Sequence, residues 1–157
     1  MIHRLATFLA TFGYSGFIRP APGTWGSLAA LPVGWLIIWL GGTVALAVAI
    51  VATFVIGLWA ARVHMHSRQT MHDPSEIVID EVAGQWIPLL PLAGFDPLGF
   101  AVAFVTFRLF DIWKPGPVGW ADKRLKGALG VMVDDIFAGI FAGLCVLLLQ
   151  YARGAFA

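Results

Sequence analysis

The chain has 157 residues, of which 59% are hydrophobic and only 12% are charged, and its formal net charge is +1. Soluble proteins carry roughly 25% charged residues, so this composition excludes an ordinary soluble domain and favours a single membrane-embedded domain, residues 1–157. A lone cysteine, Cys145, excludes an internal disulfide framework.

The predicted elements begin with a mildly apolar segment, residues 1–23, which carries His3 and Arg4 and is expected to lie at the membrane surface. A spanning helix needs about 20 apolar residues, with roughly 17 as the lower limit. The later apolar stretches predict about five membrane-embedded helices at residues 24–40, 43–61, 77–92, 98–113 and 131–151. The expected fold is therefore all-α, a polytopic integral membrane helical bundle.

The connections between these helices are also readable. Gly41-Gly42 predicts a tight turn between the first two helices. Pro88 and Pro91 predict that the third helix bends or ends early, since proline disrupts a helix interior. The third and fourth helices should then form a hairpin through residues 93–97.

Positive charge predicts the orientation. If the N-terminus is placed in the cytoplasm, every Lys and Arg except Arg153 falls at the cytoplasmic face, in agreement with the positive-inside rule. The same topology gathers every acidic residue except Asp96 at that face. The sequence thus predicts one polar layer at the cytoplasmic ends of the helices.

Two acidic pairs dominate this layer. Asp80-Glu81 opens the third helix and Asp134-Asp135 opens the fifth, and Glu76 should lie one helical turn before Asp80 on the same face. Such a cluster repels itself unless a cation neutralises it, and hard carboxylate oxygens suit Mg²⁺. The predicted Mg²⁺ ligands are Asp80, Glu81, Asp134 and Asp135, and a proton relay or a transport site is the alternative reading of the same acids.

The fourth helix places Arg108, Asp111 and Lys114 at a spacing of three residues, close to one helical face. An arginine fork binds phosphate and a lysine adds a point charge, while Asp111 holds metal or orients Arg108. The alternative is an Arg–Asp helix pair with Lys114 reaching the lipid headgroups.

Further candidates for phosphate binding lie beside two other helices. Thr24 or Ser27 can cap the first helix, whose free N–H groups and neighbouring glycines attract phosphate. His72 stands before the third helix, where an imidazole can bind phosphate or act as a general acid or base.

Four ordered motifs resemble the phosphatidylglycerophosphatase A family of bacterial membrane phosphatases: Pro22–Ala30, His72-Asp73 with Ile77–Glu81 after it, Phe107–Pro115 and Gly130–Gly139. The resemblance implies Mg²⁺-dependent removal of the terminal phosphate from a phospholipid substrate, phosphatidylglycerophosphate, at the cytoplasmic side of the bacterial inner membrane. Direct attack by water and an aspartyl-phosphate intermediate both remain open. The implied site residues, by their numbers in this sequence, are Thr24, Ser27, Asp80, Glu81, Arg108, Asp111, Lys114, Asp134 and Asp135.

Two other classes of membrane protein compete with this interpretation. A CDP-alcohol phosphotransferase also uses acids and metal, but its typical Asp-Gly, Ala-Arg, Gly, Asp, Asp signature is missing here. A small cation transporter needs polar residues that continue through the membrane, whereas the far halves of these helices are almost wholly apolar.

Overall fold

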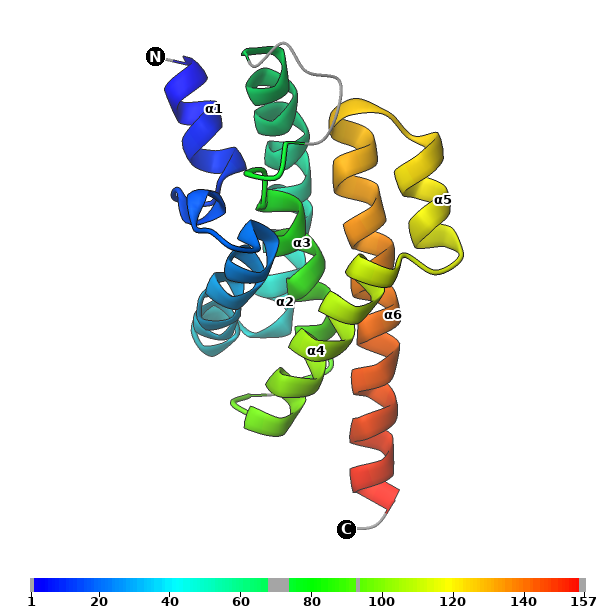
Figure 1. Ribbon diagram of the computed structural model, residues 1–157. Coiled ribbons are helices and arrows are strands. Elements are labelled where there is room, and N and C mark those ends of the chain that lie inside the picture. The colour runs from blue at the N-terminus through cyan, green and yellow to red at the C-terminus, as the bar shows by residue number, and fades with distance from the viewer. Residues whose placement is uncertain (1, 68–73, 93, 156–157) are drawn as a thin grey trace.

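The computed structural model describes residues 2–67, 74–92 and 94–155, and every regular element within these ranges is a helix (Figure 1). The predicted all-α fold is confirmed. The elements in chain order are α1 (Ile2–Ala10), the 3₁₀ helix η1 (Ser15–Phe17), α2 (Pro22–Ser67), α3 (Ile79–Trp86), the 3₁₀ helix η2 (Ile87–Leu89), α4 (Pro97–Trp113), α5 (Pro117–Arg124) and α6 (Gly127–Ala155).

Helix α2 consists of two arms that meet at Gly42, where φ is 71° and ψ is −172°. A side chain would be strained at this φ, so glycine is what allows the chain to reverse there. The predicted turn is confirmed, and the second arm continues to Ser67, six residues beyond its predicted end at position 61. The two arms run in opposite directions, with the bend toward the lower part of Figure 1.

Helix α3 is short and central. It ends at Trp86, just before Pro88, and the predicted early end of the third helix is confirmed. Seven of its eight residues are buried, because α3 packs against both α2 and α6. The backbones of α3 and α6 approach closely at glycines: a Cβ on Gly84 would lie 2.6 Å from the backbone oxygen of Asp135. This contact fixes the start of α3 beside the acidic part of α6.

Helices α4 and α5 complete the polar end of the bundle. Helix α4 runs back from the lower part of Figure 1 and contacts α6. It ends at Trp113, and the next residue, Lys114, has a positive φ of 50° that reverses the chain. The next segment lies between two predicted helices, and no helix is predicted for it. It forms the helix α5, because Pro117 starts a helix and Val118 and Ala121 supply a buried face.

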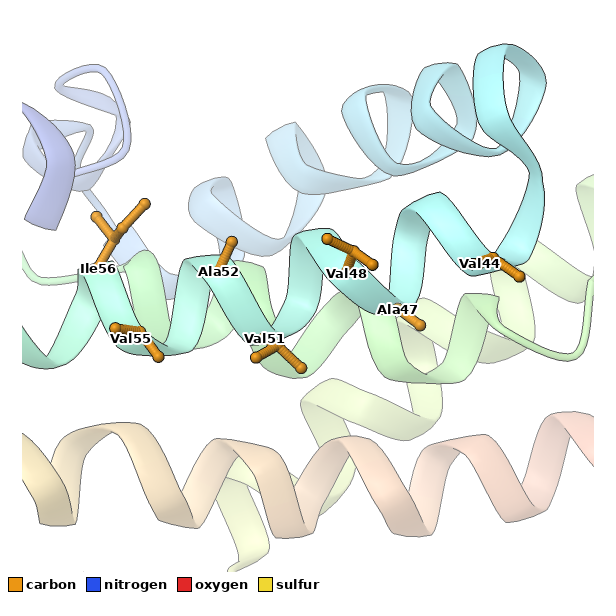
Figure 2. Close-up of a pocket in the computed structure, with 7 residues that line it drawn as sticks. All are labelled: Val44, Ala47, Val48, Val51, Ala52, Val55 and Ile56. Atoms are coloured by element: carbon orange, nitrogen blue, oxygen red, sulfur yellow. The ribbon is translucent and has the colours of Figure 1, made fainter.

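Two helices are long and apolar enough to cross a membrane by length and composition, Pro22–Ser67 and Gly127–Gly154. Figure 2 shows seven apolar side chains, from Val44 to Ile56, that line an open groove on the second arm of α2. Val44 and Val48 are 75% and 64% exposed. Large contiguous apolar surfaces are rare on soluble monomers, so these helices indicate association with a membrane.

A polar contact joins the start of α4 to the C-terminal end of α6. Asp96 caps α4 by accepting a hydrogen bond from the Gly99 amide at 3.1 Å, and it also accepts bonds from Gln150 at 2.9 Å and Arg153 at 2.5 Å. The bond from Gly99, followed by that from Gln150, holds the pKa of Asp96 below its ordinary value of 3.8.

We expect Asp96→Ala to lower the free energy of unfolding by about 1–2 kcal/mol, the usual range for loss of a helix cap. The folded state favours the ionised carboxylate, so this stabilisation is present above pH 3.8 and is lost as the pH falls through the lowered pKa. Thermal unfolding in detergent at pH 7 measures the loss, with exposed Arg62→Ala as the control. Equal melting temperatures for wild type and Asp96→Ala would show that the hydrogen bonds of Asp96 do not stabilise the fold.

Candidate functional site

Three carboxylates from two helices form the centre of the site. Asp80 and Glu81 lie in the first turn of α3, and Asp135 lies on α6 opposite them. One oxygen from each can be chosen so that all three lie within 4.8 Å of one another. We call Asp80, Glu81 and Asp135 the carboxylate cluster. Asp80 and Asp135 are only 6% and 3% exposed, so the cluster is largely shielded from water.

The cluster fits a hard divalent cation. Glu81 Oε2 and Asp135 Oδ2 are buried and have no hydrogen-bond partner among the described residues. A buried acceptor without a partner is costly, and like charges at this separation repel. Oxygen ligands are those that Mg²⁺ prefers, usually as one or two carboxylates completed by water and phosphate. The residues present therefore suit such an ion.

Arg108 links the cluster to two other elements. Its guanidinium Nη1 lies 2.5 Å from Asp111 Oδ2, 3.8 Å from Glu81 Oε1 and 3.4 Å from Ser27 Oγ. Asp111 is one turn further along α4 and fixes the orientation of the fork. Ser27 comes from the start of α2 and donates its own hydroxyl to the Gly23 carbonyl at 2.8 Å. The fork is thus held in place, and its Nε has no partner among the described residues.

Lys114 connects a second carboxylate of α6 to α5. Its Nζ donates to Asp134 Oδ2 at 2.6 Å and to Asp122 Oδ1 at 2.5 Å. Burial alone would lower the pKa of Lys114, but the hydrogen bonds and charges of these two acids outweigh it and raise the pKa above its ordinary value. Lys114 therefore stays protonated at any physiological pH, which suits charge stabilisation rather than proton transfer.

The start of α2 approaches the cluster through a residue without a side chain. A Cβ on Gly23 would overlap Glu81 Oε1 and would lie 3.2 Å from Arg108 Nη1. The absence of a side chain at position 23 lets the start of α2 lie this close to Glu81 and Arg108. Gly23 thereby brings the first turn of α2 to the same place as α3 and α4.

We expect Gly23→Ala to lower kcat/KM by roughly 10- to 100-fold, because the methyl group displaces the Glu81 carboxylate and misplacement of about 1 Å can cost that much. The overlap is with the end of a flexible side chain, so the fold should persist. Gly94→Ala is the matched control, since nothing lies within 4 Å of a Cβ there. Wild-type kcat/KM in Gly23→Ala would show that the close approach has no catalytic role.

Comparisons with known proteins decide the family. The model of the phosphatidylglycerophosphatase A family matches residues 8–150. The chain belongs to the phosphatidylglycerophosphatase A family. No solved structure matches the chain.

Curated members of the phosphatidylglycerophosphatase A family are similar over most of their length. The chain is 37% identical to phosphatidylglycerophosphatase A of Haemophilus influenzae, covering 96% of this chain and 89% of that protein. It is 36% identical to phosphatidylglycerophosphatase A of Escherichia coli, covering 85% and 77%. It is also 36% identical to a Bacteroides thetaiotaomicron protein provisionally named a phosphatidylinositol-3-phosphatase, covering 96% of each.

The structure divides the four residues that the sequence predicts as Mg²⁺ ligands. Asp80, Glu81 and Asp135 lie together, whereas Asp134 has one oxygen bound to Lys114. The other Asp134 oxygen, Oδ1, is buried and has no partner among the described residues. Asp111 contacts Arg108 and so fits the predicted role of orienting that fork.

The predicted phosphate-binding residues lie around the cluster, with corrections. Thr24 is in the first turn of α2, which begins at Pro22, and Ser27 lies a turn further on and bonds back to Gly23, so neither residue is the cap. Glu76 does not lie one helical turn before Asp80 as predicted: it is in a non-helical turn before α3 and pairs with buried His64 at 3.5 Å. His72 lies outside the described residues.

Some residues of the site are not identified by the sequence analysis. Asp122 carries no motif, and its contact with Lys114 depends on the fold of α5. Gln85, one turn beyond Glu81 on α3, is fully buried and both its amide atoms lack a partner among the described residues. The spacing of four residues between Glu81 and Gln85 predicts that their side chains lie on the same helical face, so the sequence could have indicated Gln85 as a neighbour of the carboxylate.

Proposed function

We propose that this protein hydrolyses the terminal phosphomonoester of phosphatidylglycerophosphate, giving phosphatidylglycerol and inorganic phosphate. The single observation that carries the proposal is the buried carboxylate cluster with Arg108 against it at 3.8 Å from Glu81. Acids and a fixed arginine fork in one shielded volume suit a phosphomonoester. The names of the two phosphatidylglycerophosphatase A relatives support this substrate.

We further propose that Asp80, Glu81 and Asp135 hold Mg²⁺. Asp134, the fourth acid of the site, has one oxygen on Lys114 and its other oxygen free of partners among the described residues. When bound, such an ion neutralises phosphate charge and lowers the pKa of coordinated water. The buried oxygens of Glu81 and Asp135 that lack partners among the described residues support this assignment.

The basic residues have separate tasks in this proposal. Arg108, held by Asp111 and Ser27, offers its fork to two phosphate oxygens. Lys114 contributes a fixed positive charge, because its raised pKa keeps it protonated. Developing negative charge on the phosphoryl group is thus met by donors that need little reorganisation.

We propose that the two arms of α2, the α3–η2 segment, α4 and α6 are the five membrane-embedded segments. In Figure 1 the bend between the two arms of α2, the start of α4 and the C-terminal end of α6 all lie toward one end of the molecule. The starts of α2, α3 and α6 and the end of α4, which carry the site, lie nearer the opposite end. Under the predicted topology every Lys and Arg except Arg153 falls at that face. The positive-inside rule then supports a site that faces the cytoplasm, in the bacterial inner membrane.

Phosphate release by the purified protein in detergent micelles tests the substrate. We expect release from phosphatidylglycerophosphate with kcat/KM at least about 10-fold higher than from phosphatidylinositol 3-phosphate, since one missing set of hydrogen bonds to a headgroup costs at least that much. Faster release from phosphatidylinositol 3-phosphate would favour the activity that the Bacteroides relative's name describes. No release from phosphatidylglycerophosphate would refute the proposal.

A further inference from the structure

Helix α5 has one buried face and one exposed face. Val118 and Ala121 are buried, and the helix packs against α6. Trp120 is 54% exposed on the other side, and Trp113, just before the helix, is 70% exposed. Exposed tryptophans are characteristic of the boundary between lipid tails and headgroups, where one part of the ring is apolar and another is wet.

Three cations follow Trp120 in the chain: Lys123 and Arg124, three and four residues later on the same face of α5, and Lys126, just after the helix ends. Lys123, Arg124 and Lys126 are all exposed, and none of them has an ion pair within the part of the chain that the structure describes. The fourth base of the segment, Lys114, is already shared between Asp122 and Asp134. The single acid of α5 is therefore used internally, and the outer face of the helix is positive.

This surface adjoins the catalytic site through one residue. Asp122 lies between Trp120 and Lys123 in sequence and bonds to Lys114, which in turn bonds to Asp134. Asp122 therefore joins the segment that carries these cations to the candidate phosphate-binding lysine. A lipid headgroup held on the exposed cations would lie outside the carboxylate cluster.

We propose that the α5 surface, formed by Trp120, Lys123, Arg124 and Lys126, docks anionic phospholipid headgroups of the bilayer. Charge complementarity selects this partner: three exposed cations beside an exposed indole match a negative headgroup layer above apolar tails. Each Lys or Arg near such a surface strengthens binding about fivefold at low ionic strength. The surface concentrates anionic lipid beside the site, whichever phospholipid the site hydrolyses.

The test measures lipid preference rather than turnover. Purified protein in zwitterionic mixed micelles is titrated with phosphatidylglycerol or phosphatidylcholine that carries pyrene on an acyl chain, and energy transfer from the protein's tryptophans reports binding. The test variant is the triple substitution Lys123→Gln, Arg124→Gln, Lys126→Gln. The matched control removes three exposed arginines elsewhere: Arg4→Gln, Arg19→Gln, Arg62→Gln.

We expect wild type to prefer phosphatidylglycerol, with a preference that falls as salt is raised. The α5 triple variant should lose at least about tenfold of this preference, and the control should stay within about twofold of wild type. Equal losses in the two triple variants would mean that the cations act only through net charge, and no loss in the α5 variant would mean that lipid binds elsewhere. Either result overturns the proposal, and neither depends on phosphatase activity.

Discussion

Replacing Asp135 with Asn is expected to lower kcat by about 10²–10³-fold, the size of effect that follows loss of one preorganised charged group in a shielded site. Asp135 is 3% exposed, and its Oδ2 has no partner among the described residues. Asparagine keeps the size of the side chain but loses the negative charge that a cation requires. Phosphate release from phosphatidylglycerophosphate at saturating substrate measures the effect, and Asp80→Asn should behave in the same way.

Stability separates a catalytic role for Asp135 from a structural one. Removing one of three neighbouring buried carboxylates relieves repulsion, so without added metal the melting temperature of Asp135→Asn should equal or exceed that of wild type. Asp96→Asn, which removes an acid at the opposite end of the molecule, is the control and should keep wild-type kcat. Wild-type turnover in Asp135→Asn would remove this residue from the reaction.

Arg108→Lys is expected to lower kcat/KM by about 100-fold, and Arg108→Ala by about 1000-fold. A lysine keeps the positive charge and one nitrogen that could take the place of Nη1, which contacts Ser27, Glu81 and Asp111. It has no second planar donor such as Nε, so it cannot bind two phosphate oxygens side by side. The alanine variant also leaves two partly buried acids, Glu81 and Asp111, without their cation. The measurement is the dependence of phosphate release on substrate concentration in mixed micelles.

The control for Arg108 is Arg62→Lys, an equivalent change at an exposed position on α2. It should leave kcat/KM within about twofold of wild type, as most surface substitutions are nearly neutral. If Arg108→Lys is as active as wild type, a point charge is sufficient and the fork geometry has no role in binding phosphate.

The sequence predicts most of the fold because its signals are local. Continuous apolar runs mark helices, Gly42 adopts a backbone conformation that excludes side chains, and Pro88 stops α3. The length of the second arm of α2 and the existence of α5 are not predicted. Both depend on tertiary packing, since the buried face of α5 exists only against α6.

The candidate site is predictable as a set but not as an arrangement. Adjacent residues on a helix point about 100° apart, so Asp134-Asp135 cannot both face α3. The rotation of α6 that places Asp135 in the cluster and Asp134 on Lys114 depends on its packing against Gly84. The spacing of Glu76 and Asp80 predicts that they lie one helical turn apart on one face, but α3 begins only at Ile79.

Metal removal and restoration is the most direct test of the central claim, that the carboxylate cluster holds the ion used to hydrolyse a phospholipid phosphomonoester. Purified protein is treated with EDTA, freed of chelator, and assayed for phosphate release from phosphatidylglycerophosphate with and without added Mg²⁺. The account predicts that release falls to background and returns on addition of Mg²⁺ to wild type but not to Asp135→Asn. Undiminished release by metal-free wild type would contradict it.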